Sequence, residues 1–141
     1  MSKRGAEKTV LVIEDDLDIR DAIQEILQDE GYSVFTADNG VVALDVLGRI
    51  PRPGLVLLDL MMPEMDGHQF LEVLRADPRF TSVPVVVVSA GITVVPAIAG
   101  HIRKPFDTEV LLKTVRRFYA SPDSDRNFGE RGSTAGSGTG P

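Results

Sequence analysis

Three carboxylates in this chain come directly after runs of apolar residues. Glu14 and Asp15 follow the run TVLVI at 9–13, and Asp59 follows the run LVLL at 55–58. Short apolar runs bounded by turn signals predict strands buried on both faces, as in parallel sheets. Ligands bind at the carboxyl ends of the strands in open α/β sheets. We therefore expect the three carboxylates at a ligand-binding edge of one sheet.

Carboxylates gathered at such an edge repel one another. Two like charges about 4 Å apart cost about 4 kcal/mol at an effective dielectric constant near 20, so protons or a cation must relieve the repulsion. A small set of hard oxygen ligands, with room for water and a phosphate, suits Mg²⁺. The alternative is a solvated acidic rim without metal, which is the commoner case for an isolated acidic cluster. Carboxylates that end two separate buried strands favour the metal.

Ser89 and Lys104 follow two later predicted strands and are expected at the same edge. A hydroxyl donates a hydrogen bond to a phosphoryl oxygen, and an ammonium group neutralises phosphate as a point charge. Each residue type alone is common on protein surfaces, so their shared position is the informative part. Together with Asp59 as a nucleophile and a divalent cation, they predict phosphoryl transfer to a carboxylate.

Strands and helices alternate along the chain. Strands are predicted over residues 9–13, 32–37, 55–59, 85–88 and 100–103. Helices with apolar residues at helical spacing lie between them or follow, and their predicted N-caps are Asp16, Asn39, Asp66 and Asp107. Gly31 is placed to end the first helix. The residues of the last helix that we expect to face inward are Val110, Leu111, Val115 and Phe118. The alternation indicates right-handed crossovers and a doubly wound α/β fold.

Length and composition set the limits on this interpretation. The 141 residues are enough for one domain, which we place at 8–120, between a disordered arm at 1–7 and a disordered Gly/Ser-rich tail at 121–141. A net charge of −6 argues against a nucleic-acid partner. The chain has no cysteine, which excludes disulfides and thiol chemistry and fits a cytoplasmic protein.

Residues 80–102 lack Asp, Glu, Lys and Arg, and this length is enough to span a bilayer. Proline and glycine divide the segment into short pieces, at Pro84, Gly91, Pro96 and Gly100. Two buried strands with a connection between them explain the segment better than a transmembrane helix, so we expect no contact with a membrane.

Four motifs resemble those of the receiver domains of two-component response regulators, the CheY-like superfamily. They are VLVIEDD at 10–16, LLDLMMPEMDG at 57–67, VVVVSA at 85–90 and KPF at 104–106. The resemblance covers about residues 8–120. It implies a flavodoxin-like fold, with a five-stranded parallel sheet in the order 2-1-3-4-5.

The resemblance also implies roles for the acidic residues. Asp59 is the expected phosphoacceptor. Asp15 is expected to bind Mg²⁺ directly and Glu14 through water, with Asp59 and the backbone carbonyl of Met61 as further ligands. Mn²⁺ or Ca²⁺ are expected substitutes for Mg²⁺ in such a site.

The same resemblance implies that Ser89 is the switch hydroxyl and Lys104 the lysine of the family pattern, with a cis peptide bond between Lys104 and Pro105. Position His101 departs from the pattern, because the family usually has a Tyr or Phe there that rotates as a switch. Histidine can rotate as well, and it adds a titratable group. The alternative is that His101 is a half-buried strand residue without a switching role.

A second departure lies between Ser89 and Lys104, where the family has a full amphipathic helix. Only ITVVPAIA, residues 92–99, lies between two glycines, and Pro96 interrupts it. We therefore predict a shortened or irregular fourth helix. The apolar segment is either an exposed contact, through which the 91–103 face binds a downstream protein or a second copy of the chain, or it fills the sheet face left bare by the shorter helix.

The resulting prediction is a stand-alone receiver that accepts a phosphoryl group on Asp59 from a sensor histidine kinase or phosphotransfer protein. It is not expected to be an enzyme beyond Mg²⁺-dependent self-phosphorylation and autodephosphorylation. The alternative is a phosphorylation-independent interaction module, which the altered fourth helix and His101 favour and the intact acidic set opposes. A phosphoaspartate hydrolase would need a second Asp two residues after the nucleophile, where this chain has Met61.

Overall fold

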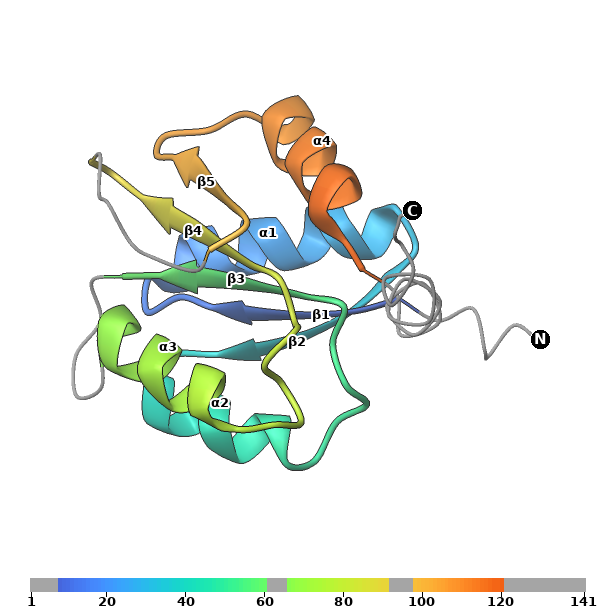
Figure 1. Ribbon diagram of the computed structural model, residues 1–141. Helices are drawn as coiled ribbons and strands as arrows, with labels where there is room; N and C mark the ends of the chain where they lie inside the picture. The colour runs from blue at the N-terminus through green and yellow to red at the C-terminus, as the bar shows by residue number, and fades with distance from the viewer. Residues whose placement is uncertain (1–7, 61–65, 92–97, 121–141) are drawn as a thin grey trace, which may run out of the picture.

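A five-stranded parallel sheet forms the middle layer of the computed structural model, which describes residues 8–60, 66–91 and 98–120 (Figure 1). The strands are β1 (Lys8–Ile13), β2 (Tyr32–Ala37), β3 (Leu55–Asp59), β4 (Val85–Ser89) and β5 (Gly100–Arg103). Their order is β2-β1-β3-β4-β5, and all paired strands run parallel. The predicted doubly wound sheet and its strand order are confirmed.

Two helices cover each face of the sheet, with α1 and α4 on one face and α2 and α3 on the other (Figure 1). They are α1 (Leu17–Asp29), α2 (Gly40–Leu47), α3 (Gly67–Ala76) and α4 (Thr108–Phe118). All four predicted N-caps are confirmed, because each side chain accepts a hydrogen bond from the backbone N–H three residues later. Gly31 follows α1 with a φ of 96°, in the left-handed region that glycine adopts without strain.

The two core layers follow the periodicity of the strands. Leu11, Val56 and Val87 pack on the side of α2 and α3, whereas Val10, Leu57 and Val86 pack on the side of α1 and α4. All of these side chains are almost completely buried, and each contributes about 1.5–3 kcal/mol relative to an exposed position. The rigid sheet that results fixes where each strand ends.

One expected core residue, Val110, is 44% exposed, so that prediction was wrong. The reason is helical phase: Leu111 and Val115, four residues apart, are fully buried against the sheet, and this turns Val110 toward solvent. Phe118 is half-buried and packs against the same cluster as Leu111.

The residues after α4 fold back onto the amino ends of two strands. The hydroxyl of Tyr119 accepts a hydrogen bond of 3.0 Å from the N–H of Thr9, and the N–H of Ala120 donates to the carbonyl of Gly54 at 3.0 Å. The N–H of Gly54 in turn donates to the carbonyl of Thr9 at 2.9 Å. A side chain at position 54 would overlap the Tyr119 ring, so the close approach requires glycine.

The connection from β4 to β5 is short. Of residues 90–99, only Ala90, Gly91, Ile98 and Ala99 are described, and none of these four is helical. The irregular fourth helix was predicted for residues 92–99, of which 92–97 lie outside the described residues. Among the residues that the structure does describe, no helix is long and apolar enough to cross a membrane.

Candidate functional site

The ends of β1 and β3 bring the three acidic side chains together. These strands are neighbours, with Ile13 paired to Leu58, so Glu14 and Asp59 leave the sheet side by side. Carboxylate oxygens of Glu14, Asp15 and Asp59 lie within 4.8 Å of one another. Glu14 and Asp59 are only 1% and 4% exposed, whereas Asp15 is exposed. The strand order alone therefore dictates an acidic cluster at this edge.

Glu14 is held firmly by its neighbours. Its N–H donates to the carbonyl of Ala37 in β2 at 3.0 Å, and its own carbonyl accepts from Nη1 of Arg20 at 3.2 Å. One carboxylate oxygen, Oε2, accepts from the N–H of Asp16 at 3.2 Å. The other, Oε1, is buried, and the ammonium group of Lys104 lies 2.9 Å from it.

Lys104 supplies the positive charge of the site. Its ammonium nitrogen lies 2.9 Å from Oε1 of Glu14 and 3.8 Å from Oδ2 of Asp59. The Lys104 N–H donates to the carbonyl of Ser89 at 2.8 Å, which fixes the start of the lysine to the end of β4. The Lys104–Pro105 peptide bond is cis, as expected. The lysine thus bridges two carboxylates that come from different strands.

The donor set fits a hard divalent cation. Three carboxylates face one ammonium group, so the described cluster has an excess of negative charge. Glu14 and Asp59 are also buried, so water does little to reduce the repulsion between their charges. Oxygen ligands in this number suit Mg²⁺ with water in its remaining positions. The expected ligand Met61 lies outside the described residues.

Ser89 lies at the same edge, at the end of β4, where the preceding Val88 pairs with Asp59 of β3. Its hydroxyl is 2.9 Å from the carbonyl oxygen of Gly91 and 2.9 Å from Nε2 of His101, and the residue is 5% exposed. His101 itself is exposed on β5, so the half-buried position considered from the sequence is wrong. The contact between Ser89 and His101 was not predicted from the sequence. The only signal for it is the strand register.

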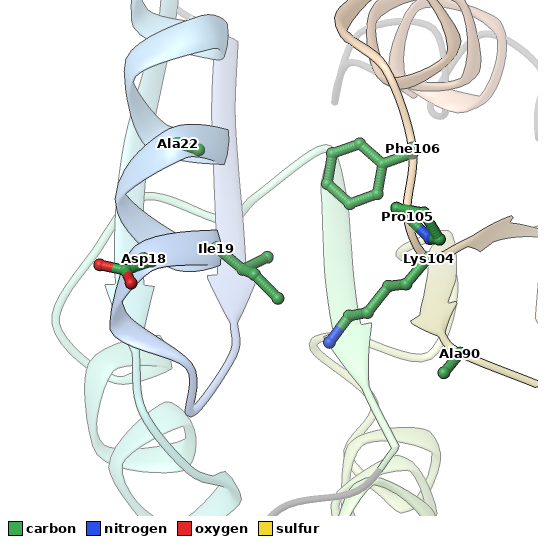
Figure 2. A pocket seen from close by; sticks show the side chains of 7 residues that line it. All are labelled: Asp18, Ile19, Ala22, Ala90, Lys104, Pro105 and Phe106. Carbon is green, nitrogen blue, oxygen red and sulfur yellow. The ribbon is translucent and has the colours of Figure 1, made fainter.

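A pocket of about 520 Å³ opens beside Lys104, and the sequence analysis did not identify it (Figure 2). It lies between α1 and the segment after β5, and its lining is mostly apolar. The lining residues are Asp18, Ile19, Ala22, Ala90, Lys104, Pro105 and Phe106. Figure 2 shows Ile19 on one side and the Lys104 side chain and Phe106 ring on the other. This volume is within the range of ligand pockets in proteins.

Comparison with known sequences gives a consistent result. The family model described as response regulator receiver domain matches residues 10–116. The chain is 36% identical over 129 residues to the response regulator Rre1 of Synechocystis sp., covering 86% of this chain and 55% of that protein. It is 35% identical over 114 residues to the DNA-binding response regulator MtrA of Mycolicibacterium paratuberculosis, covering 76% of this chain and 49% of that protein. The chain thus spans about half the length of these curated relatives.

Solved structures show the same architecture. The chemotaxis protein CheY4 of Vibrio cholerae superposes with a TM-score of 0.75 and 30% identity, covering 80% of this chain and 99% of that chain. The receiver domain of the sensor histidine kinase PA1611 of Pseudomonas aeruginosa, a structure described as having a magnesium ion in its active site cleft, superposes with a TM-score of 0.73. At 24% identity, with 80% of this chain and 98% of that chain covered, it supports the fold alone. The chain therefore belongs to the response regulator receiver family, whose domains are signalling modules that interact with histidine kinases or phosphotransfer proteins.

Proposed function

We propose that Asp59 accepts a phosphoryl group from a sensor histidine kinase or phosphotransfer protein and that this event changes which partner the domain binds. The observation that carries the proposal is that the buried Asp59 carboxylate lies beside both the acidic pair and the ammonium group of Lys104. A carboxylate buried beside a cation-binding set and an ammonium group is suited to in-line attack on phosphorus, where the protein contributes positioning and charge neutralisation.

Transfer of the phosphoryl group from the donor histidine to Asp59 needs no further reactant. An oxygen of Asp59 forms a bond to phosphorus while the bond from phosphorus to the donor histidine nitrogen breaks. The electron pair of that bond returns to the imidazole. Glu14, Asp15 and Asp59 would hold Mg²⁺, which when bound neutralises charge on the transferring group. The ammonium of Lys104, already 3.8 Å from Oδ2 of Asp59, would bind an oxygen of the phosphoryl group.

The pocket beside Lys104 supports a protein donor. Its apolar side chains, among them Ile19, Ala22 and Phe106, offer a surface for a protein partner beside Lys104. A donor seated there would bring its histidine to the edge where Asp59 and Lys104 meet. Self-phosphorylation by a small phosphodonor and autodephosphorylation, both dependent on Mg²⁺, are part of the same proposal.

Downstream partners are expected at the face formed by residues 91–103. The 91–103 face would bind a downstream protein or a second copy of the chain, and His101 and Arg103 are exposed there on β5. We keep the absence of nucleic-acid binding as a prediction for residues 8–120 only, because the name of the longer relative MtrA includes DNA binding. The stand-alone form and the cytoplasmic location stay predictions.

Intact-mass spectrometry tests the central step. The protein is incubated with acetyl phosphate and either Mg²⁺ or excess EDTA, and wild type is compared with Asp59→Asn. Asp45→Asn is the matched control, because Asp45 is an exposed carboxylate on α2 that pairs with Arg49. We expect one added phosphoryl group in wild type and the control, dependent on Mg²⁺, and none in Asp59→Asn. A folded wild type without any addition would contradict the proposal and favour the phosphorylation-independent module.

A further inference from the structure

The hydroxyl of Ser89 has a single hydrogen and two close neighbours. One is the carbonyl oxygen of Gly91 at 2.9 Å, which can only accept a hydrogen bond. The other is Nε2 of His101, also at 2.9 Å. Because the hydroxyl hydrogen goes to Gly91, Nε2 must carry a hydrogen and donate it to the Ser89 oxygen. His101 therefore holds the hydroxyl from one side while Gly91 holds it from the other.

In this arrangement the Ser89 hydroxyl donates its hydrogen to Gly91 and not toward Asp59. Ser89 is almost completely buried and follows Val88, the residue paired with Asp59. To donate to a phosphoryl oxygen on Asp59, the Ser89 hydroxyl must release the carbonyl of Gly91. The hydroxyl can turn only if the hydrogen bond from His101 breaks or follows it.

The register of β4 with β5 brings His101 into reach of the Ser89 hydroxyl. Val87 pairs with His101 and Ser89 pairs with Arg103, so the side chains of Ser89 and His101 lie on the same face of neighbouring strands. The backbone of Ser89 is also fixed, because its carbonyl accepts from the N–H of Lys104 at 2.8 Å. With the backbone held, the side-chain bonds to Gly91 and His101 determine the direction of the hydroxyl.

We propose that His101 is a positioning residue whose Nε2–H holds the Ser89 hydroxyl toward Gly91, so that this bond and phosphoryl binding at Asp59 compete. The proposal rests on the proposed function of Asp59 and adds a means of regulating it. Coupling of this kind is reciprocal. A partner that draws the exposed His101 ring away from Ser89 would strengthen phosphoryl binding, and a phosphoryl group on Asp59 would release the His101 ring at the surface of β5.

Binding of beryllofluoride, a non-covalent mimic of the phosphoryl group, tests the competition at fixed pH with Mg²⁺ present. His101→Phe keeps a flat ring but removes the N–H donor, whereas His101→Gln keeps an N–H donor. Losing a neutral hydrogen bond that opposes binding is expected to raise the affinity of His101→Phe about three- to tenfold. His101→Gln is expected to stay closer to wild type. Fluorine NMR or calorimetry measures the dissociation constants.

A double-mutant cycle with Ser89→Ala separates the proposed bond from a general effect of the ring. In the Ser89→Ala background, His101→Phe is expected to have no effect on beryllofluoride binding. Equal affinities of wild type and His101→Phe, or the same gain with and without the hydroxyl, would overturn the role of His101. If wild type itself fails to bind beryllofluoride, the proposed function of Asp59 fails, which is a different result from the loss of the His101 effect alone.

A spectroscopic readout checks the bond directly. Nitrogen-15 shifts of the His101 ring are expected to show a hydrogen on Nε2 in wild type, and these shifts are expected to change in Ser89→Ala. A wild-type ring with its hydrogen only on Nδ1 would contradict the arrangement.

Discussion

The ammonium nitrogen of Lys104 lies 2.9 Å from Oε1 of Glu14, and this ion pair joins the ends of β5 and β1, which are separated in the sheet by β4 and β3. The lysine therefore reaches across the carboxyl edge and passes within 3.8 Å of Asp59 on the way. Glu14 is 1% exposed, so its charge has little access to water. Removing one partner of a buried pair leaves the other charge uncompensated, which is more costly than never having had the pair.

Lys104→Met is expected to lower the free energy of unfolding by about 1–3 kcal/mol, because the Glu14 carboxylate loses its charged partner. Urea denaturation in EDTA measures the change. Lys113→Met is the control, because Lys113 pairs with Glu109 on the exposed face of α4. The control is expected to change stability by less than about 0.5 kcal/mol. Equal losses in the two variants would contradict the role assigned to the buried pair.

Mg²⁺ is expected to stabilise the folded chain, because it binds a site that exists only when β1 and β3 are paired. At a hundred times its dissociation constant, a ligand adds about 2.7 kcal/mol. Asp15→Asn is expected to reduce this gain while leaving stability in EDTA nearly unchanged, since Asp15 is exposed. Thermal denaturation with and without Mg²⁺ gives both values. Asp21→Asn, an exposed carboxylate on α1, serves as the control. A full Mg²⁺ effect in Asp15→Asn would argue against Asp15 as a ligand.

Gly54→Ala is expected to destabilise the domain by about 1–3 kcal/mol, because the added methyl group meets the Tyr119 ring and lies 2.7 Å from the carbonyl oxygen of Ala120. Gly48→Ala is the matched control. At position 48 the nearest atom would be 3.6 Å away, and the backbone has a φ of −75°, which alanine adopts readily. The control is expected to be neutral or slightly stabilising. Chemical denaturation of both variants checks the difference.

Burial raises the pKa of Tyr119 above its usual value, although the hydrogen bond from Thr9 lowers it in part, and burial likewise raises the pKa of Tyr32. An unfolded chain then loses these protons first. The contribution of these two tyrosines to the free energy of unfolding is fully present below about pH 10, and it is lost as the pH rises through their folded-state pKa values. The chain has two tyrosines and no tryptophan, so tyrosinate absorbance reports only these groups. Tyr119→Phe is expected to weaken the alkaline loss of stability. Titration of both tyrosines at or below their usual pKa would contradict this.

Local sequence patterns predicted the elements of the fold well. The strands Tyr32–Ala37, Leu55–Asp59 and Gly100–Arg103 were predicted with the bounds that the structure gives. Each N-cap was predicted because its signal lies within three residues of the helix start. The acidic cluster was predicted because strand order and strand ends are enough to place Glu14 beside Asp59.

Contacts that depend on side-chain direction were not predicted. The prediction that Val110 is buried was wrong, because the buried residues Leu111 and Val115 set which side of the helix faces the sheet. The contact between Ser89 and His101 depends on the register of β4 with β5. Arg75 provides another example: its Nη1 donates to the carbonyls of Thr81 and Val83 at 3.0 and 2.9 Å, and so holds the connection before β4. No pattern of neighbouring residues indicates which carbonyl groups such a side chain will reach.

The hydrogen bond from Thr9 to Tyr119 joins the two ends of the domain, because these residues are 110 positions apart in the chain. A contact of such long range has a large loop-closure entropy cost, so it is favoured only after the intervening segments have folded. The amide of Thr9 is therefore expected to exchange its hydrogen only when the whole domain opens. Because Lys8 and Ala120 lie at the same edge, a short peptide joining them would permit circular permutation, with new ends opened in an exposed turn. Such a permuted chain would keep its acidic cluster, which lies at the opposite edge of the sheet.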